Sequence, residues 1–118
     1  MNKIEIQKFI LTELSNFCFN KYTKGFKYLV ESIYLCIENN DLIDNLNKYI
    51  FPIVAKNYNE KSPQNVKWCI NQVIKTMCCN TKIDILSNYF GTNENKTPSL
   101  KLIIYTLICK YHWTYSSK

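Results

Sequence analysis

The chain has 118 residues, is 47% hydrophobic with only two glycines and three prolines, and carries a formal net charge of +6. That length gives room for one domain but not for two, and no apolar run approaches the roughly 18 residues of a membrane-spanning helix. Since the N-terminal segment MNKIEIQKFI is also unlike a secretory leader, we expect a single domain, residues 1–118, in the cytoplasm.

The first part of the chain predicts two helices. Apolar residues at helical spacing indicate a helix over about 3–15, namely Ile4, Ile6, Phe9, Ile10 and Leu14. After a connector at 16–22, a similar pattern predicts a second helix over about 23–38. The polar segment at 39–41 ends that helix and can cap the next one.

The middle of the chain predicts a helix-turn-helix at about 50–79. A helical region at about 42–58 contains Pro52, which predicts a break near 49–51 and a short helix over 53–58. Asn59 lies in the following turn and tolerates the left-handed conformation that ends a helix. Ser62 is then predicted as the N-cap, and Pro63 as the first residue, of a longer helix that continues to about residue 79.

Two more helices complete the prediction. Residues 83–90 form a small helix that stops at Gly91, and 92–97 is polar and loop-like. Pro98 opens a last helix, whose inner side has Leu100, Ile103, Ile104, Leu107, Ile108 and Tyr111. The sequence therefore predicts an all-α fold, a compact bundle of about six helices containing a helix-turn-helix.

The helix after Ser62 has one apolar and one polar side. Its buried stripe is predicted to contain Val66, Cys69, Ile70, Val73, Ile74 and Met77. The other side has Gln64, Asn65, Lys67, Trp68, Asn71, Gln72 and Lys75. A short helix, a tight turn and a longer helix of this kind can place the second helix in the major groove of DNA. An ordinary amphipathic helix is the other interpretation.

The positive charge is concentrated on the same part of the chain. Between Lys48 and Lys82 there are six lysines and one acid, whereas the remaining residues have nine lysines and eight acids. From residue 28 to residue 47 the sign inverts, with four acids and no lysine: Glu31, Glu38, Asp41 and Asp44. This pattern favours a protein that presents one face to a polyanion and keeps another away from it, although lysines also occur on inert surfaces.

Six cysteines and one histidine do not form a metal or catalytic pattern. There is no C-x-x-C, and His112 has no partner at ligand spacing. Paired carboxylates, a phosphate-cradling loop and a nucleophile motif are also missing, so we expect neither an enzyme nor a cofactor. The thiols are predicted to be reduced and to act as small apolar core residues, with the adjacent Cys78 and Cys79 buried.

Five segments resemble, in order and spacing, the C-terminal DNA-binding domain of the sporulation response regulator, stage zero sporulation protein A. They are TKGFKYLVESI at 23–33, IFPIVAKNYN at 50–59, VKWCINQVI at 66–74, KIDILSNYFG at 82–91 and the helix after Pro98. The resemblance covers residues 4–111. It implies a six-helix fold with an internal helix-turn-helix, promoter binding as a transcription factor, and paired copies on double-stranded DNA. It also implies that the segment 80–91 contacts the sigma subunit of RNA polymerase, with Lys82, Asp84 and Asn88 as candidates.

Two departures from the family affect what the resemblance implies. The family's recognition helix resembles S-R-V-E-R-A-I-R-H-A-I, and residues 64–74 here are QNVKWCINQVI. The buried positions persist, but the arginines, the glutamate and the histidine are replaced, so the family's DNA target is not expected to carry over. The chain also begins just before the DNA-binding part, without a receiver domain, and we expect no switching by phosphorylation.

The altered polar side predicts a target rich in A and T. Arginine, the commonest partner of guanine, does not occur in the chain, whereas asparagine and glutamine pair with adenine and an aromatic group can contact the thymine methyl. The candidate base-reading residues are Gln64, Asn65, Lys67, Trp68, Asn71 and Gln72. Phosphate contacts are expected from Lys56, Lys61, Ser62 and Lys75, and also from Lys67, each lysine adding about one unit of salt dependence.

Trp68 has three interpretations. It contacts bases, it packs against a second copy of the protein, or it folds back onto a neighbouring helix, which is the usual fate of a tryptophan.

Two functions compete for this sequence. The first is a stand-alone DNA-binding transcriptional regulator, favoured by the charge of the helix-turn-helix region. The second is a protein-interaction module that has lost DNA binding and pairs with or antagonises a full-length sporulation regulator, favoured by the loss of every arginine.

Overall fold

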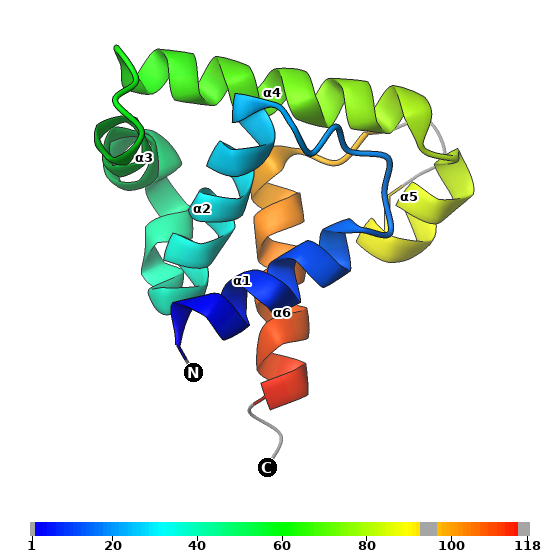
Figure 1. Ribbon diagram of the computed structural model, residues 1–118. Coiled ribbons are helices and arrows are strands. Elements are labelled where there is room, and N and C mark those ends of the chain that lie inside the picture. The colour runs from blue at the N-terminus through cyan, green and yellow to red at the C-terminus, as the bar shows by residue number, and fades with distance from the viewer. Residues whose placement is uncertain (1, 93–96, 116–118) are drawn as a thin grey trace.

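A computed structural model describes residues 2–92 and 97–115, which contain six α-helices (Figure 1). They are α1 (Lys3–Leu14), α2 (Lys24–Glu38), α3 (Phe51–Asn57), α4 (Pro63–Asn80), α5 (Ile83–Phe90) and α6 (Leu100–Tyr115). A 3₁₀ helix, η1 (Asn40–Asn45), and a π-helix, η2 (Leu46–Ile50), lie between α2 and α3. Within the described residues there is no strand, and the all-α prediction is confirmed.

Capping side chains fix where four of the helices begin. Asn2, Thr23 and Ser62 each accept a hydrogen bond from the backbone N–H three residues further on, at 2.9, 3.2 and 3.2 Å. At α6 the cap is Ser99, whose Oγ accepts from the N–H of Leu102 at 3.1 Å. The prediction that Pro98 opens this helix is therefore wrong, because the hydroxyl at 99 satisfies a backbone donor that proline cannot.

The predicted break near 49–51 is not present. The backbone leaves the helical conformation earlier, at Asn45, which has φ −147° and ψ 79° and caps η2. From Leu46 to Asn57 the chain is one helical run whose type changes from π in η2 to α in α3. The N–H of Phe51 donates to the carbonyl of Leu46, five residues earlier. Pro52 lies in the first turn of α3, where its missing N–H leaves no hydrogen bond unmade. The proline thus begins an α-helix without interrupting the helical chain before it.

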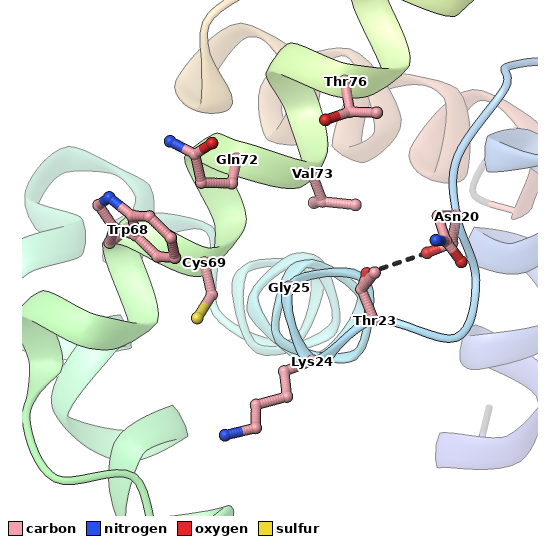
Figure 2. A pocket seen from close by; sticks show the side chains of 9 residues that line it. All are labelled: Asn20, Thr23, Lys24, Gly25, Trp68, Cys69, Gln72, Val73 and Thr76. Atoms are coloured by element: carbon pink, nitrogen blue, oxygen red, sulfur yellow. Dashed lines mark hydrogen bonds between the residues drawn. The ribbon is translucent and has the colours of Figure 1, made fainter.

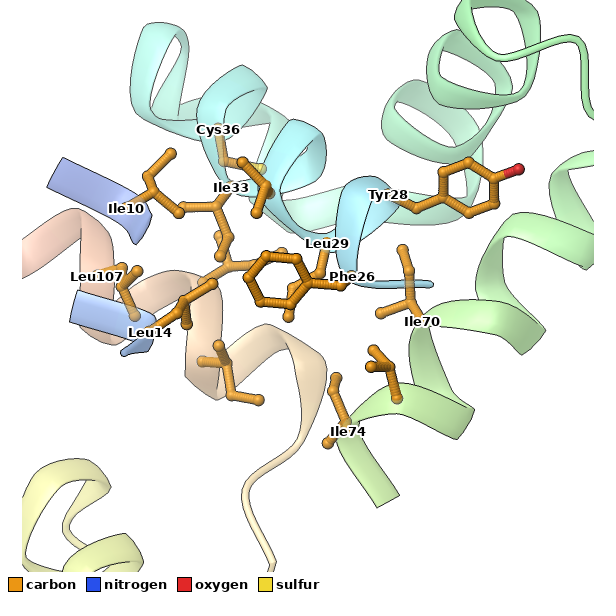
Figure 3. Packing of buried hydrophobic residues seen from close by; sticks show 14 of the residues in the cluster. Ile10, Leu14, Phe26, Tyr28, Leu29, Ile33, Cys36, Ile70, Ile74 and Leu107 are labelled. Carbon is orange, nitrogen blue, oxygen red and sulfur yellow. The ribbon is translucent and has the colours of Figure 1, made fainter. Parts of the chain in front are cut away.

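The core is assembled around α2. Figure 1 shows α2 between α1, α3, α4 and α6, and ten of its fifteen residues are buried. Figure 3 shows Leu29 and Ile33 of α2 among side chains from α1, α4 and α6, including Leu14, Ile70 and Leu107. Because α4 packs directly on α2, its orientation is determined by the centre of the domain.

Two predictions about burial on α1 and α2 are wrong. Ile4, placed on the apolar side of the first helix, is exposed. Glu31, counted with the acids that repel a polyanion, is buried, and its carboxylate lies 3.4 Å from Nζ of Lys3. On α2 it shares a face with the buried Tyr28, three residues earlier, and the ion pair with Lys3 of α1 compensates the charge of the buried carboxylate. The acids exposed in this segment are Glu38, Asp41 and Asp44.

Candidate nucleic-acid interface

Local backbone features set the turn between α3 and α4. Asn59 has a φ of 54°, in the left-handed region that asparagine tolerates, and the N–H of Glu60 donates to the carbonyl of Ala55 at 2.8 Å. Ser62 and Pro63 occupy the cap and first-turn positions predicted for them. The chain therefore forms a short helix, a tight turn and a long helix over 51–80.

A tyrosine of α2 holds this turn. The Tyr28 hydroxyl donates to Oε2 of Glu60 at 2.5 Å, and Nζ of Lys24 lies 3.9 Å from the same oxygen. The Glu60 side chain is 12% exposed, and the hydrogen bond from Tyr28 is the largest cause that lowers the pKa of its carboxyl. Burial, and then the bonded carboxylate, raise the pKa of Tyr28. The only acid between Lys48 and Lys82 is thus held by α2.

The two sides of α4 are largely as predicted. Val66, Ile70, Val73, Ile74 and Met77 are buried, while Cys69 is half-buried. All six predicted base-reading residues are exposed: Gln64, Asn65, Lys67, Trp68, Asn71 and Gln72. No Asp or Glu occurs in α4. The outward side therefore combines amide, ammonium and indole groups with no acidic group of the helix's own.

Trp68 is 63% exposed. That exposure is against the interpretation in which the indole folds back onto a neighbouring helix. Bases and a second copy of the protein remain as the two interpretations of this side chain.

The N-terminal end of α2 fixes α4 at close range. A Cβ added at Gly25 would lie 2.2 Å from the carbonyl oxygen of Cys69 and 3.2 Å from Cβ of Val73. Only glycine permits such an approach of the two helices. The outward side of α4 is therefore supported from behind by a rigid backbone contact.

Two clefts flank the outward side of α4. One has a volume of about 270 Å³ and lies between α4 and the segment 20–25, as Figure 2 shows. Trp68, Gln72 and Thr76 line it from α4. The other, of about 570 Å³, lies between α4 and residues 97–100, with Asn71 and Lys75 among its lining. Neither cleft is lined by an Asp or Glu among the described residues.

The predicted phosphate contacts lie at the start and along the length of this surface. Lys56, Lys61 and Lys75 are exposed, at the end of α3, in the turn and in α4. Ser62 is half-buried, and its Oγ already accepts the hydrogen bond from Asn65 N–H. Its hydroxyl hydrogen can still donate to a phosphate oxygen.

The candidate sigma-contacting residues form a separate surface on α5 and the residue before it. Lys82, Asp84 and Asn88 are all exposed. Ile83 and Ile85, next to them, are exposed aliphatic residues.

The segment 20–24 was missed as part of this surface. Asn20, Thr23 and Lys24 line the cleft beside Trp68, although more than forty residues separate the two in sequence. In the sequence, Lys21 and Lys24 lie outside the basic segment between Lys48 and Lys82. A weak signal was present, because 20–30 contains three lysines and no acid.

The prediction of reduced thiols is confirmed, whereas the prediction that the cysteines lie in the core is wrong for the three exposed ones. Cys36 is buried, Cys69 and Cys78 are half-buried, and Cys18, Cys79 and Cys109 are exposed; all six are free thiols. Helical geometry explains Cys79, which lies one residue beyond Cys78 and about 100° around α4, so the two thiols cannot both face the core. Among the described residues no cluster of His, Cys, Asp or Glu could hold a metal ion.

An all-α domain with a short helix, a tight turn and a capped second helix that displays amides and lysines has the architecture of helix-turn-helix DNA-binding domains. The family model described as sporulation initiation factor Spo0A C terminal matches residues 10–110, and the chain belongs to that family. It is accordingly a DNA-binding transcription-regulator domain of the effector type, in a family that is non-enzymatic. The resemblance drawn from the sequence segments is confirmed.

None of the helices in 2–92 and 97–115 has the length and apolar character needed to cross a membrane.

Proposed function

We propose that the whole chain acts as one helical DNA-binding domain, a cytoplasmic transcriptional regulator whose α4 lies in the major groove. The observation that supports this most is the outward side of α4, where lysine, amide and indole groups are exposed and no acid occurs in the helix. Phosphates supply most of the attraction between a protein and DNA. A helix with this surface, held rigidly from behind at Gly25, suits that partner.

The base contacts come from the exposed amides and the indole. Asn71 and Gln72 lie near the middle of the outward side and pair with adenine in the geometry that amides favour. Trp68 lies between them and the turn, and its ring contacts thymine methyl groups. Gln64, Asn65 and Lys67 contact the bases nearest the start of α4. The expected target is accordingly rich in A and T.

The phosphate contacts come from lysines around the edge of this surface. Lys56, Lys61, Lys67 and Lys75 are exposed, and Ser62 donates its hydroxyl hydrogen at the start of α4. Each lysine that neutralises a phosphate contributes about 0.9 to the slope of log affinity against log salt. Four of them predict a slope of roughly −3 to −4.

Further partners follow from membership of the family. We propose that α5 contacts the sigma subunit of RNA polymerase through Lys82, Asp84 and Asn88, and that two copies of the chain occupy DNA side by side. The exposure of these three residues supports the first proposal.

A titration of labelled random-sequence duplex DNA at two salt concentrations tests DNA binding. Between about 50 and 200 mM salt, the affinity should fall roughly 100-fold if four phosphates are contacted. Absence of binding at the lower salt would contradict the proposal and favour the module that pairs with a full-length relative. Selection from a random pool then tests the target, and recovery of G-rich sites would contradict the expected preference for A and T.

A further inference from the structure

A second basic segment lies beside α4. Residues 20–27 contain Lys21, Lys24 and Lys27 and no acid, and all three lysines are exposed. Tyr22, between the first two, is 96% exposed. This segment spans the end of the connector after α1 and the start of α2. It therefore lies outside the helix-turn-helix formed by α3 and α4.

Contacts at both ends hold this segment along α4. Near its start, the backbone N–H of Cys18 donates to Oγ1 of Thr81, the residue that follows α4, at 2.9 Å. At its end, Gly25 lies against the carbonyl of Cys69 in the middle of α4. Between these points, the Thr23 hydroxyl donates to the carbonyl of Asn20 at 2.9 Å. The segment therefore keeps a fixed place beside the helix.

The cleft between this segment and α4 is continuous with the base-reading side. Trp68 and Gln72 belong to both surfaces. Figure 2 shows them on α4 on one side of the cleft, with Asn20 and Thr23 on the other. The polar groups that line the cleft are amides, hydroxyls and one ammonium: Asn20, Gln72, Thr23, Thr76 and Lys24. With no carboxylate among them, the cleft suits an anion.

We propose that this cleft receives a phosphate of the same DNA duplex that α4 reads, so that one DNA strand passes over residues 20–24. Lys24 supplies the charge, and Lys21 adds to it from the adjacent turn. The inference rests on the proposed function and extends its surface to a part of the chain remote from the helix-turn-helix. A helix lying in the major groove has a DNA strand on each side, and the segment 20–24 lies on one side of α4.

Lys24 is available for this role despite its neighbour Glu60. The Lys24 side chain is 74% exposed, and its ammonium lies 3.9 Å from the carboxylate. Only the carboxylate end of this pair is buried, whereas the ammonium is in solvent, where salt screens its attraction to Glu60. When the ammonium turns to a phosphate, Glu60 keeps its hydrogen bond from Tyr28.

The test compares lysine variants on a duplex recovered from a random pool by the wild-type protein. Lys24→Gln should lower the slope of log affinity against log salt by about 0.9 and weaken binding about 5–10-fold at roughly 0.1 M salt. Lys24→Arg should restore the slope, since it keeps the charge. The matched control is Lys8→Gln, because Lys8 is an exposed lysine on α1 that lines a different cleft, with Glu5 and Tyr115.

A single methylphosphonate, moved through the duplex, then locates the phosphate. At one position, the methylphosphonate should weaken DNA binding by the wild type but not DNA binding by Lys24→Gln. Two results would overturn the inference and leave the proposed function intact. One is an equal salt slope for Lys24→Gln and Lys8→Gln. The other is that the loss of affinity from Lys24→Gln adds to the loss from the methylphosphonate at every position. If the wild type binds no duplex at low salt, the proposed function itself fails.

Discussion

Gly25 shows how one residue sets the distance between two helices. Alanine favours a helix over glycine by about 1 kcal/mol, yet a Cβ here would meet the carbonyl oxygen of Cys69 at 2.2 Å. That carbonyl is backbone, so α2 and α4 must separate to admit the methyl group. The sequence offered no sign of this contact, because a glycine in the first turn of a helix is compatible with many environments.

We expect Gly25→Ala to lower the free energy of unfolding by about 1–3 kcal/mol and also to weaken DNA binding, since α4 is displaced. Urea denaturation and a DNA titration measure the two effects. Gly91→Ala is the control. Gly91 has a φ of 67° with no atom near its missing Cβ, so strain of about 1 kcal/mol should leave DNA affinity unchanged. Equal DNA affinities of the two variants would contradict the role of Gly25.

Cysteine reactivity should follow burial in the fold. Burial raises the pKa of the Cys36 thiol to about 12, and the thiolate is the reacting form. At about pH 8, iodoacetamide should alkylate the exposed Cys18, Cys79 and Cys109 well before Cys36. Peptide mapping by mass spectrometry gives the rates. If Cys36 were alkylated as fast as Cys109 in the native protein, Cys36 would not be buried in the core around α2.

At the scale of elements, the boundaries of α4 were predictable because the signals are local. Ser62 and Pro63 suit the first turn of a helix whatever surrounds them, and the stripe of buried residues repeats at helical spacing. The 3₁₀ and π turns at 40–50 were not predictable in this way. Their hydrogen-bonding type depends on how the chain between α2 and α3 fits the packed core, which residue types alone do not encode.

The connection of α2 to the turn is a second element that local signals did not show. Tyr28→Phe removes the hydrogen bond to Glu60 and should lower the free energy of unfolding by about 1 kcal/mol near pH 7. The pKa of Glu60 is lowered in the folded protein from its ordinary value of 4.5. Stabilisation from such a group is fully present above the ordinary value and is lost as the pH falls through the folded-state pKa.

The difference in free energy of unfolding between wild type and Tyr28→Phe should therefore stay constant from about pH 8 to pH 5 and shrink below that range. Thermal or urea unfolding across pH measures it. Tyr34→Phe is the matched control, since Tyr34 donates to Glu38 in an exposed pair and should change stability little. A difference that grows as the pH falls would contradict the connection.

At the scale of the whole molecule, charge and fold act together. The exposed acids Asp41 and Asp44 lie in η1, beyond the C-terminal end of α2, whereas the N-terminal end of α2 meets α4. A fifteen-residue helix separates the two ends by about 22 Å, more than two Debye lengths at about 0.1 M salt. The acids thus lie at the far end of α2 from its contact with the middle of α4, which weakens their repulsion of DNA there.

The fold was predictable at this scale, whereas part of the surface was not. The spacing of apolar residues and the helix-start and helix-end signals along the chain together predict the all-α bundle. The surface that Lys24 and Trp68 share depends on which segments the core brings together. The distribution of charge along the sequence does not contain that information. The inward position of Glu31 was missed for a similar reason, because its partner is Lys3 of another helix.

The two tryptophans provide the most direct measurement of which face binds DNA. Trp68 is on the outward side of α4, and Trp113, 81% exposed, is near the C-terminal end of α6. Figure 1 shows that end of α6 on the opposite side of the molecule from α4. Their indole N–H resonances can be followed in one NMR titration with duplex DNA. If α4 binds the duplex, the Trp68 resonance shifts while the Trp113 resonance stays in place. A shift of Trp113 with Trp68 unchanged would contradict the claim that α4 is the DNA-binding helix.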